Sequence, residues 1–177
     1  MKRVMIVGQP GSGKSTLARM LGEVTGLRVV HMDKIHWMSG WVQRDDEGRW
    51  ALVNETHARE EWIFEGGFSR SWDVRATRAD TLIWIDVGVW KRLLRVTWRF
   101  IKYFGQARPD LPEGCKEGNW RELIIFYQWI WTTRHSARRR IEAVIETHRA
   151  GLDVVVLSTI PEVERYVEAV RAGITRG

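Results

Sequence analysis

A glycine-rich loop followed by a lysine and a serine lies close to the start of the chain. The spacing G-x-x-x-x-G-K-[ST] is met by Gly8, Gly13, Lys14 and Ser15. Glycines let successive backbone N–H groups turn toward phosphate oxygens, and a helix that begins at the loop adds its unpaired N–H groups. Lys14 would reach the β- and γ-phosphates, and the Ser15 hydroxyl would ligate Mg²⁺. We therefore expect a nucleoside triphosphate to bind the run Gly8, Gln9, Pro10, Gly11, Ser12, Gly13, Lys14, Ser15 and Thr16.

Three carboxylates follow short apolar runs typical of strands: Asp33, Glu65 and Asp86. Ligands of parallel α/β sheets bind outside the carboxyl ends of the strands, and phosphoryl transfer uses acidic groups near Mg²⁺ and near an acceptor hydroxyl. Asp33 is the candidate for orienting or deprotonating the acceptor. Each carboxylate could instead be a helix cap or a solvated turn residue. His36 and Trp37 could line an acceptor pocket, and His36 is equally compatible with plain packing.

Basic residues concentrate in one segment. Residues 91–140 hold 12 Lys and Arg against 4 Asp and Glu, whereas residues 1–88 hold 12 of each. Spacings of 3, 4 and 3 place four of them on one helix face: Arg92, Arg95, Arg99 and Lys102. Mobile arginines can neutralise the charge of a transferring phosphoryl group while they close the site to water. The alternatives are a solvated helix face and a nucleic-acid contact. Arginines that converge on the phosphate loop favour phosphoryl transfer, and an outward stripe favours nucleic acid.

The elements that must position these residues alternate between strand-like and helix-like runs, which predicts an α/β fold. Expected strands cover 4–7, 29–32, 62–64, 81–85 and 154–157, and expected helices cover about 14–24, 47–59, 89–103, 118–149 and 160–171. Thr159 and Glu162 predict a capping box for the last helix. The segment at about 104–118 contains prolines and glycines and is expected to be a lid or insert. No second-domain boundary is visible, so the expectation is one domain over 1–177.

Composition excludes several classes of protein. The chain has 177 residues and a net charge of +6, and its one cysteine, Cys115, allows no internal disulfide. A reduced, cytoplasmic setting is the simplest interpretation. No apolar run reaches the roughly 18 residues that a membrane-spanning helix needs, and we expect no membrane partner. No Cys and His grouping has metal-ligand spacing, and no Asn-Lys-x-Asp guanine motif is present, so ATP is favoured over GTP.

The order of these features resembles that of the adenylate-kinase-like P-loop kinases, which include nucleoside monophosphate, shikimate and gluconate kinases. More narrowly, the chain is similar to bacterial proteins labelled "DNA topology modulation protein" or adenylate kinase-related kinase. Beyond the loop at 8–15, the resemblance rests on the runs 31–37, 62–69, 78–81, 108–110, 113–115 and 129–131, with Gly40 and Trp41. Where nucleoside monophosphate kinases carry Asp-Gly-aromatic-Pro-Arg after the third strand, this chain has Glu65-Gly66-Gly67-Phe68-Ser69-Arg70.

The resemblance implies a three-layer P-loop NTPase fold with a five-stranded parallel sheet in the order 2-3-1-4-5, helices on both faces and a helical lid. It implies ATP and Mg²⁺ as cofactors. With the residues above, the expected catalytic set is Lys14, Asp33, Arg95, Arg99, Arg134 and Arg138. The expected acceptor-binding set is Asp33, His36, Trp37, Glu65, Gly66 and Arg70, and the expected metal ligands are Ser15 and Glu65.

Two functions follow as hypotheses. The first is a kinase that transfers the γ-phosphoryl group of ATP to a small molecule: a nucleotide, a nucleoside or another hydroxyl compound. The second is an ATP-dependent regulator that binds nucleic acid through the basic segment, with weak or no kinase activity. A GTPase-like switch is a third class, disfavoured by the missing guanine motif. The sequence favours the kinase and leaves the acceptor open.

Overall fold

Five runs of β-branched and aromatic residues form a central parallel sheet. The computed structural model describes residues 1–173. The strands are β1 (Arg3–Gly8), β2 (Val29–His31), β5 (Trp62–Glu65), β6 (Thr81–Ile85) and β7 (Asp153–Leu157). They lie in the order β2-β5-β1-β6-β7, and every neighbouring pair is parallel. Counted along the chain as strands of this sheet alone, this is the predicted order 2-3-1-4-5, which is confirmed.

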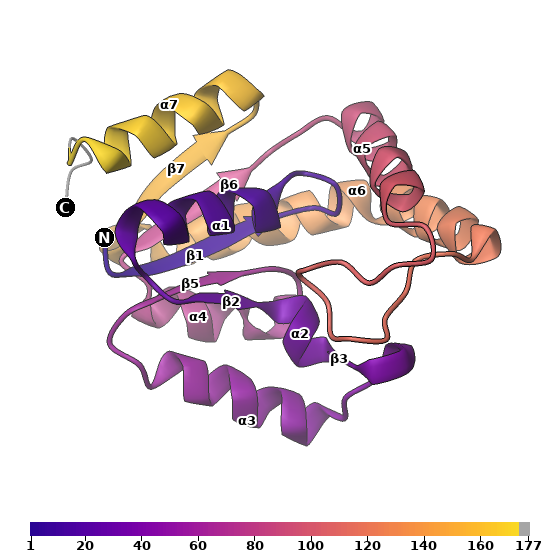
Figure 1. The fold of residues 1–177 in the computed structure, drawn as a ribbon. Coiled ribbons are helices and arrows are strands. Elements are labelled where there is room, and N and C mark those ends of the chain that lie inside the picture. Colours follow the sequence, from indigo (N-terminus) through magenta and orange to yellow (C-terminus); the bar gives the residue numbers. More distant parts are fainter. Residues whose placement is uncertain (174–177) are drawn as a thin grey trace.

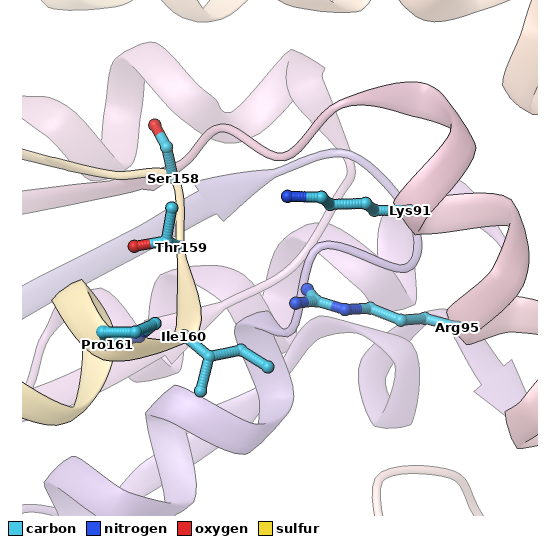
Figure 2. Close-up of a pocket in the computed structure, with 6 residues that line it drawn as sticks. All are labelled: Lys91, Arg95, Ser158, Thr159, Ile160 and Pro161. Carbon is cyan, nitrogen blue, oxygen red and sulfur yellow. The ribbon is translucent and has the colours of Figure 1, made fainter.

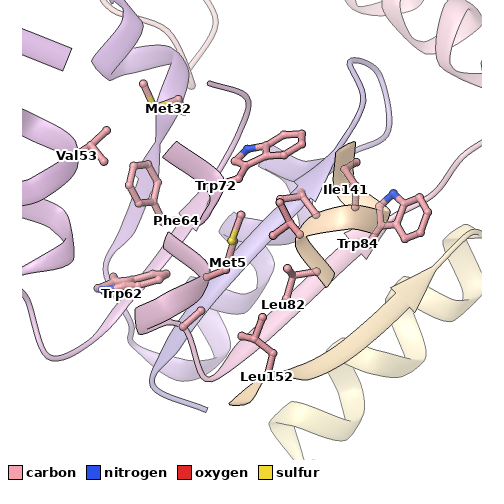
Figure 3. Packing of buried hydrophobic residues seen from close by; sticks show 14 of the residues in the cluster. Met5, Met32, Val53, Trp62, Phe64, Trp72, Leu82, Trp84, Ile141 and Leu152 are labelled. Atoms are coloured by element: carbon pink, nitrogen blue, oxygen red, sulfur yellow. The ribbon is translucent and has the colours of Figure 1, made fainter. Parts of the chain in front are cut away.

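Alternation along the strands divides the core between the two faces of the sheet. In β1, Val4 and Ile6 face α1 (Lys14–Thr25) and α7 (Ile160–Arg171), while Met5 and Val7 face the opposite side. That opposite side is covered by α3 (Asp46–His57), α4 (Trp72–Arg78) and the second half of α6 (Trp120–His148), as Figure 1 shows. Figure 3 shows Met5 and Leu82 of the sheet packed beside Ile141 of α6. The predicted three layers are therefore present.

The helical ends follow the capping chemistry of the sequence. Thr159 accepts from the Glu162 N–H, and the Glu162 side chain accepts from the Thr159 N–H, so the predicted capping box of α7 is confirmed. The first half of α6 packs against α5 (Val89–Lys102) through Val96, Phe100, Leu123 and Ile130. Residues 103–119 join these two helices. This connection contains no helix, and isolated bridges hold it together between Phe104 and Glu117 and between Ala107 and Lys116.

Residues 32–43 differ from the sequence-based expectation. Met32 was expected to end the second strand and Asp33 to follow it, but both lie in the short helix α2 (Met32–His36). A two-stranded hairpin follows, with β3 (Trp37–Met38) antiparallel to β4 (Val42–Gln43). Runs of two or three residues carry no periodicity, so the hydrophobic pattern could not reveal them. Within residues 1–173, no helix combines the length and the hydropathy needed to cross a bilayer.

Candidate active site

The phosphate-binding loop joins the carboxyl end of β1 to the first turn of α1. Its glycines adopt positive φ angles, with 77° at Gly11 and 108° at Gly13. A Cβ at Gly11 would lie 2.5 Å from the backbone oxygen of Arg92, so the loop is pressed directly against α5. Gly13 precedes the first residue of α1 and directs the chain into the helix. The expected strand–loop–helix arrangement is therefore present, and the loop also contacts a helix that is distant in sequence.

Two polar side chains of the loop, those of Ser12 and Lys14, are buried or half-buried. The Lys14 Nζ donates to the Gln9 carbonyl oxygen at 3.3 Å, across the mouth of the loop. Burial lowers the pKa of Lys14, and the nearby carboxylates of Glu65 and Asp33 oppose this shift. The Ser12 hydroxyl is buried and has no hydrogen-bond partner within residues 1–173. A free buried hydroxyl beside a lysine and a helix start fits a triphosphate that brings its own acceptor oxygens.

Two carboxylates lie across from Lys14. Glu65, at the end of β5, is buried, and its Oε1 lies 2.6 Å from the Nδ1 of His31. Asp33 lies in the first turn of α2, where burial and the charge of Glu65 raise its pKa while Arg108 and Lys14 oppose the shift. A carboxylate with a raised pKa is a stronger base when it is ionised, which suits proton removal from an acceptor hydroxyl.

The connection 103–119 supplies an acidic residue that was not among the expected site residues. The Ser15 hydroxyl donates to the Oδ2 of Asp110 at 3.3 Å. Both Asp110 and Arg108 are buried, and Arg108 bridges Asp110 at 3.3 Å and Glu117 at 3.1 Å. Burial opposes the shift, but Arg108 and Arg99 lower the pKa of Asp110, which therefore remains ionised. The 95 residues between Ser15 and Asp110 explain why spacing along the sequence did not reveal this contact.

The arginines of α5 converge on the phosphate-binding loop. Arg95 donates to the Ser12 carbonyl oxygen at 2.8 Å, and Arg92 donates to the carbonyl oxygens of Val87 at 3.0 Å and Pro10 at 3.5 Å. The buried Nε of Arg99 has no partner within residues 1–173. Burial lowers the pKa of Arg99, as does Arg108, against the opposing charges of Glu117, Asp110 and Asp33. Lys102, the fourth member of the stripe, is exposed beside the ring of Tyr103.

Arg134 and Arg138 do not join this cluster, contrary to expectation. The Arg134 guanidinium lies over the ring of Trp131, 4.1 Å from its centroid, and only its backbone oxygen contacts the loop, by accepting from the Gln9 side chain at 2.8 Å. Arg138 pairs with Asp86 at 2.7 Å and Glu142 at 2.9 Å. Both guanidinium groups therefore have partners outside the phosphate-binding space. Asp86, at the end of β6, is neutralised by Arg138.

Of the remaining residues expected to bind the acceptor, two lie beside the site and one lies outside it. Arg49 donates to the Nδ1 of His36 at 3.0 Å, and burial together with this arginine lowers the pKa of His36. The ring of Trp37 meets His36 edge-on at 4.6 Å. Arg70 is exposed and forms an ion pair with Asp46 at 2.9 Å on the surface of the protein. His36 and Trp37 extend the α2 side of the site, whereas Arg70 lies outside it.

A buried arginine holds the turn that follows Glu65. Arg75 donates to the carbonyl oxygens of Gly67 at 2.7 Å and Gly66 at 3.3 Å, and its guanidinium lies 4.2 Å from the centre of the Phe64 ring. Burial lowers the pKa of Arg75 to about 9, with the charge of Glu65 opposing the shift. A Cβ at Gly66 would lie 2.6 Å from that of Met32, so this glycine permits close packing. Gly66 and Arg75 therefore position Glu65.

An open pocket adjoins the loop at the ends of β6 and β7. Figure 2 shows Lys91 and Arg95 extending from α5 toward the turn at 158–161. The pocket has a volume of about 420 Å³ and is lined by Lys91, Arg95, Ser158, Thr159, Ile160 and Pro161. A second pocket shares Lys91, Ser158 and Thr159 and extends to Trp90. Arg95 contacts both the pocket and the loop, so a ligand could occupy the two together.

A metal ion in this site would need oxygen ligands beyond those of the protein. Within residues 1–173, no three His, Cys, Asp or Glu side chains gather closely enough to hold a metal ion. The Ser15 hydroxyl and the Asp110 carboxylate, 3.3 Å apart, are a hard-oxygen pair of the kind that Mg²⁺ prefers. Magnesium commonly takes its other ligands from water and substrate phosphates, so this pair fits Mg²⁺ bound with a nucleotide.

Comparisons with known proteins support the fold. No protein-family model and no curated protein matches the chain. Among solved structures, a shikimate kinase from Acinetobacter baumannii in complex with shikimate is 15% identical, with a TM-score of 0.54 over 98% of this chain and 93% of that one. A deoxyadenosine kinase from M. mycoides with bound dATP is 13% identical, with a TM-score of 0.56 over 97% and 98%. A shikimate kinase from Bacteroides thetaiotaomicron is 13% identical, with a TM-score of 0.54 over 98% of each chain. The chain therefore has the P-loop kinase fold.

Proposed function

We propose that the chain is a small-molecule kinase that binds ATP with Mg²⁺ and transfers the γ-phosphoryl group to a hydroxyl of an acceptor beside Asp33. The observation that carries this proposal is the convergence of Arg92, Arg95 and Arg99 on the phosphate-binding loop, opposite Asp33 and Glu65. Positive charge on one side and a base on the other are the two requirements of phosphoryl transfer to a hydroxyl. A nucleic-acid regulator would need those arginines on an outward face.

The nucleotide would span the loop and the adjoining pocket. Lys14 and the loop N–H groups bind the β- and γ-phosphates, and Arg95 lies where it can contact them. The pocket beside Arg95 has a volume within the range of small-molecule sites and can receive the nucleoside part. Ser15 and Asp110 would hold Mg²⁺, which would neutralise part of the charge of the phosphates.

The acceptor would bind between α2, the end of β5 and the connection 103–119. Asp33 takes the hydroxyl proton as the acceptor oxygen forms its bond to the γ-phosphorus, and the bond from that phosphorus to the departing ADP oxygen breaks. Arg99 stabilises the negative charge that moves onto the transferred group and the leaving oxygen. Glu65, positioned by His31 and Arg75, supplies a fixed negative charge beside Lys14 and Asp33. The missing disulfide capacity and the use of ATP make the cytoplasm the setting that we propose.

An acceptor screen tests the proposal. The purified chain is incubated with ATP, Mg²⁺ and single candidates from three classes: nucleosides, nucleoside monophosphates and hydroxy acids such as shikimate, the ligand of one structural neighbour. Release of ADP is followed, and the phosphorylated product is identified by mass spectrometry. We expect one class to stimulate ADP release and the Asp33→Asn variant to abolish the stimulation. ATP binding without any acceptor-dependent turnover across the panel would contradict the kinase.

A further inference from the structure

The outward face of α5 is apolar along its length. Trp90 and Trp98 are each 68% exposed, and Leu94 and Ile101 are also mostly exposed. Spacings of 4, 4 and 3 residues place these four side chains on one face of the helix, opposite buried Val96 and Phe100. Large apolar side chains that line one helix face are not expected to remain in water.

The first half of α6 continues this surface. The ring of Trp131 lies 5.4 Å from that of Trp90, and the ring of Trp120 lies 6.2 Å from that of Phe104. The first contact joins α5 to α6, and the second joins the residues just after α5 to the start of α6, so the exposed side chains form one surface. We name it the α5–α6 face, and it consists of Trp90, Leu94, Trp98, Ile101, Phe104, Trp120, Ile124 and Trp131.

The area of the α5–α6 face exceeds what a monomer usually leaves in water. A tryptophan offers about 200 Å², so its four tryptophans, 40–68% exposed, leave roughly 450 Å². The four other side chains bring the total to about 800 Å² of mainly apolar surface, against roughly 300–600 Å² for the largest patch of a typical monomer. A standard protein interface buries about 800 Å² on each partner. The face is therefore large enough for a stable pair.

The charges around the face indicate which partner fits it. Four of the 12 basic side chains in residues 91–140 are turned inward, because Arg92, Arg95 and Arg99 point to the phosphate-binding loop and Arg108 is paired with acids. The basic side chains beside the face are Lys91, Lys102, Arg121 and Arg134, whose guanidinium lies over the ring of Trp131. An acidic lipid surface or nucleic acid would need more outward positive charge. A second copy of this chain presents the same apolar surface and requires none.

We propose that a second copy of the chain covers the α5–α6 face. The α5 and α6 helices of one chain pack against those of the other around a twofold axis, in an isologous interface whose centre holds Leu94, Trp98 and Ile124. Buried tryptophans at such a centre contribute most of the binding free energy. The inference does not depend on the kinase proposal, because a catalytically inactive chain would pair in the same way.

The mass of the full chain in solution tests this inference. Multi-angle light scattering and sedimentation equilibrium should give the mass of two chains. Ile124→Glu places a charge in the face, at a residue that is 56% exposed, and should give the mass of one chain. Val74→Glu is the control: Val74 is also an exposed β-branched residue on a helix, is 41% exposed and lies on α4, which contacts the His148 end of α6 and not the face. This variant should keep the mass of two chains.

Circular dichroism of the three proteins should superimpose, because both substituted residues are exposed. Ile101→Glu, on α5, provides an independent second variant and should also give single chains. A parent protein with the mass of one chain, or an Ile124→Glu protein that stays paired, would overturn the inference. A parent that runs as one chain and sediments with phosphatidylserine vesicles would assign the face to lipid instead.

Discussion

Two effects act on the charge of Lys14 in opposite directions: burial disfavours the charged form, and the carboxylates of Glu65 and Asp33 favour it. A bound triphosphate would add further negative charge beside Lys14. Replacement by alanine should weaken ATP binding by about 1.5–3 kcal/mol, or roughly 10- to 150-fold, which is the contribution of a charge-assisted hydrogen bond. Titration calorimetry measures this change. Lys102→Ala is the control, because Lys102 is exposed and lies beside the ring of Tyr103, and the ATP affinity of this variant should equal that of the parent.

Substitution of Asp33 tests whether catalysis can be lost while ATP binding is kept. Asp33→Asn keeps the shape of the side chain and removes its basicity, so turnover should fall by about 10²- to 10⁴-fold while ATP affinity changes little. Initial rates with the acceptor identified by the screen, together with an ATP titration, give both quantities. Asp73→Asn, an exposed substitution on α4, should leave both unchanged. An equal loss of ATP binding would show that Asp33 serves the metal or the nucleotide.

At the scale of elements, the connection 103–119 spans the two halves of the site. The Trp41 indole N–H donates to the Lys116 carbonyl oxygen at 3.0 Å, and Cys115 contacts the Met38 carbonyl oxygen at 3.3 Å, so the connection is held to the β3–β4 hairpin. Its other anchor is Asp110, at Ser15 of the phosphate-binding loop. A segment fixed at both ends in this way can close over a bound nucleotide and acceptor together.

Limited proteolysis tests this closure. ATP with Mg²⁺ should slow cleavage between Gly105 and Gly118, because ligands at Ser15 and Asp110 add contacts that an open segment would lose. Asp110→Ala should be cleaved faster than the parent and should gain less protection from ATP. The Lys14→Ala protein is the control, since weak ATP binding should remove the protection. Equal cleavage of the parent with and without ATP would contradict a moving lid.

The elements also show how far sequence reasoning extends. The long helices and the five sheet strands have clear periodicity and bounding glycines, so their positions could be predicted to within a few residues. The β3–β4 hairpin could not be, because two-residue strands have no period. Arg134 and Arg138 were expected in the site from the resemblance, but their guanidinium groups have partners outside it. Spacing shows which residues share a face but does not show whether that face meets the site.

Buried charge was equally inaccessible from the sequence. Arg75 is an ordinary helix residue in the sequence, and only the packed structure places its guanidinium beneath the 66–67 turn. Asp110 became a site residue through a contact across 95 residues. The strand, loop and helix at residues 3–25, by contrast, were predictable because the motif is contained in eight consecutive residues. Local chemistry can be inferred from sequence, whereas chemistry assembled by tertiary contacts requires the structure.

At the scale of the whole molecule, stability should depend on the protonation of His57. This side chain is buried beside Trp62 and Phe64, and burial together with Arg75 and Arg78 lowers the pKa of His57 to about 4. Histidine in the unfolded chain titrates near pH 6.5, so between these values the unfolded chain binds a proton that the folded chain does not. The free energy of unfolding should therefore fall as the pH is lowered from about 6.5 to 4.

Urea unfolding at a series of pH values checks this expectation. His57→Gln removes the titrating group, so its stability should change less over the same range, even if its stability at pH 7 is lower than that of the parent. His135→Gln provides the comparison, because His135 is exposed and should leave the slope of the parent unaltered. Parallel pH profiles for the parent and His57→Gln would show that other groups cause the acid sensitivity.

The contact between Gly11 and the backbone of Arg92 links the loop side of α5 to the α5–α6 face on the other side of the helix. A Cβ at Gly11 would lie 2.5 Å from the Arg92 backbone oxygen and 3.0 Å from the Val96 Cγ2, so we expect a shift of the loop on phosphate binding to move α5 as well. The opposite side of that helix carries the α5–α6 face. Pairing and nucleotide binding then share one rigid body, and thermodynamic linkage makes their influence reciprocal. If ATP tightens pairing by some factor, pairing raises the affinity for ATP by the same factor. The fraction of chains that hold ATP would then rise with the concentration of the protein.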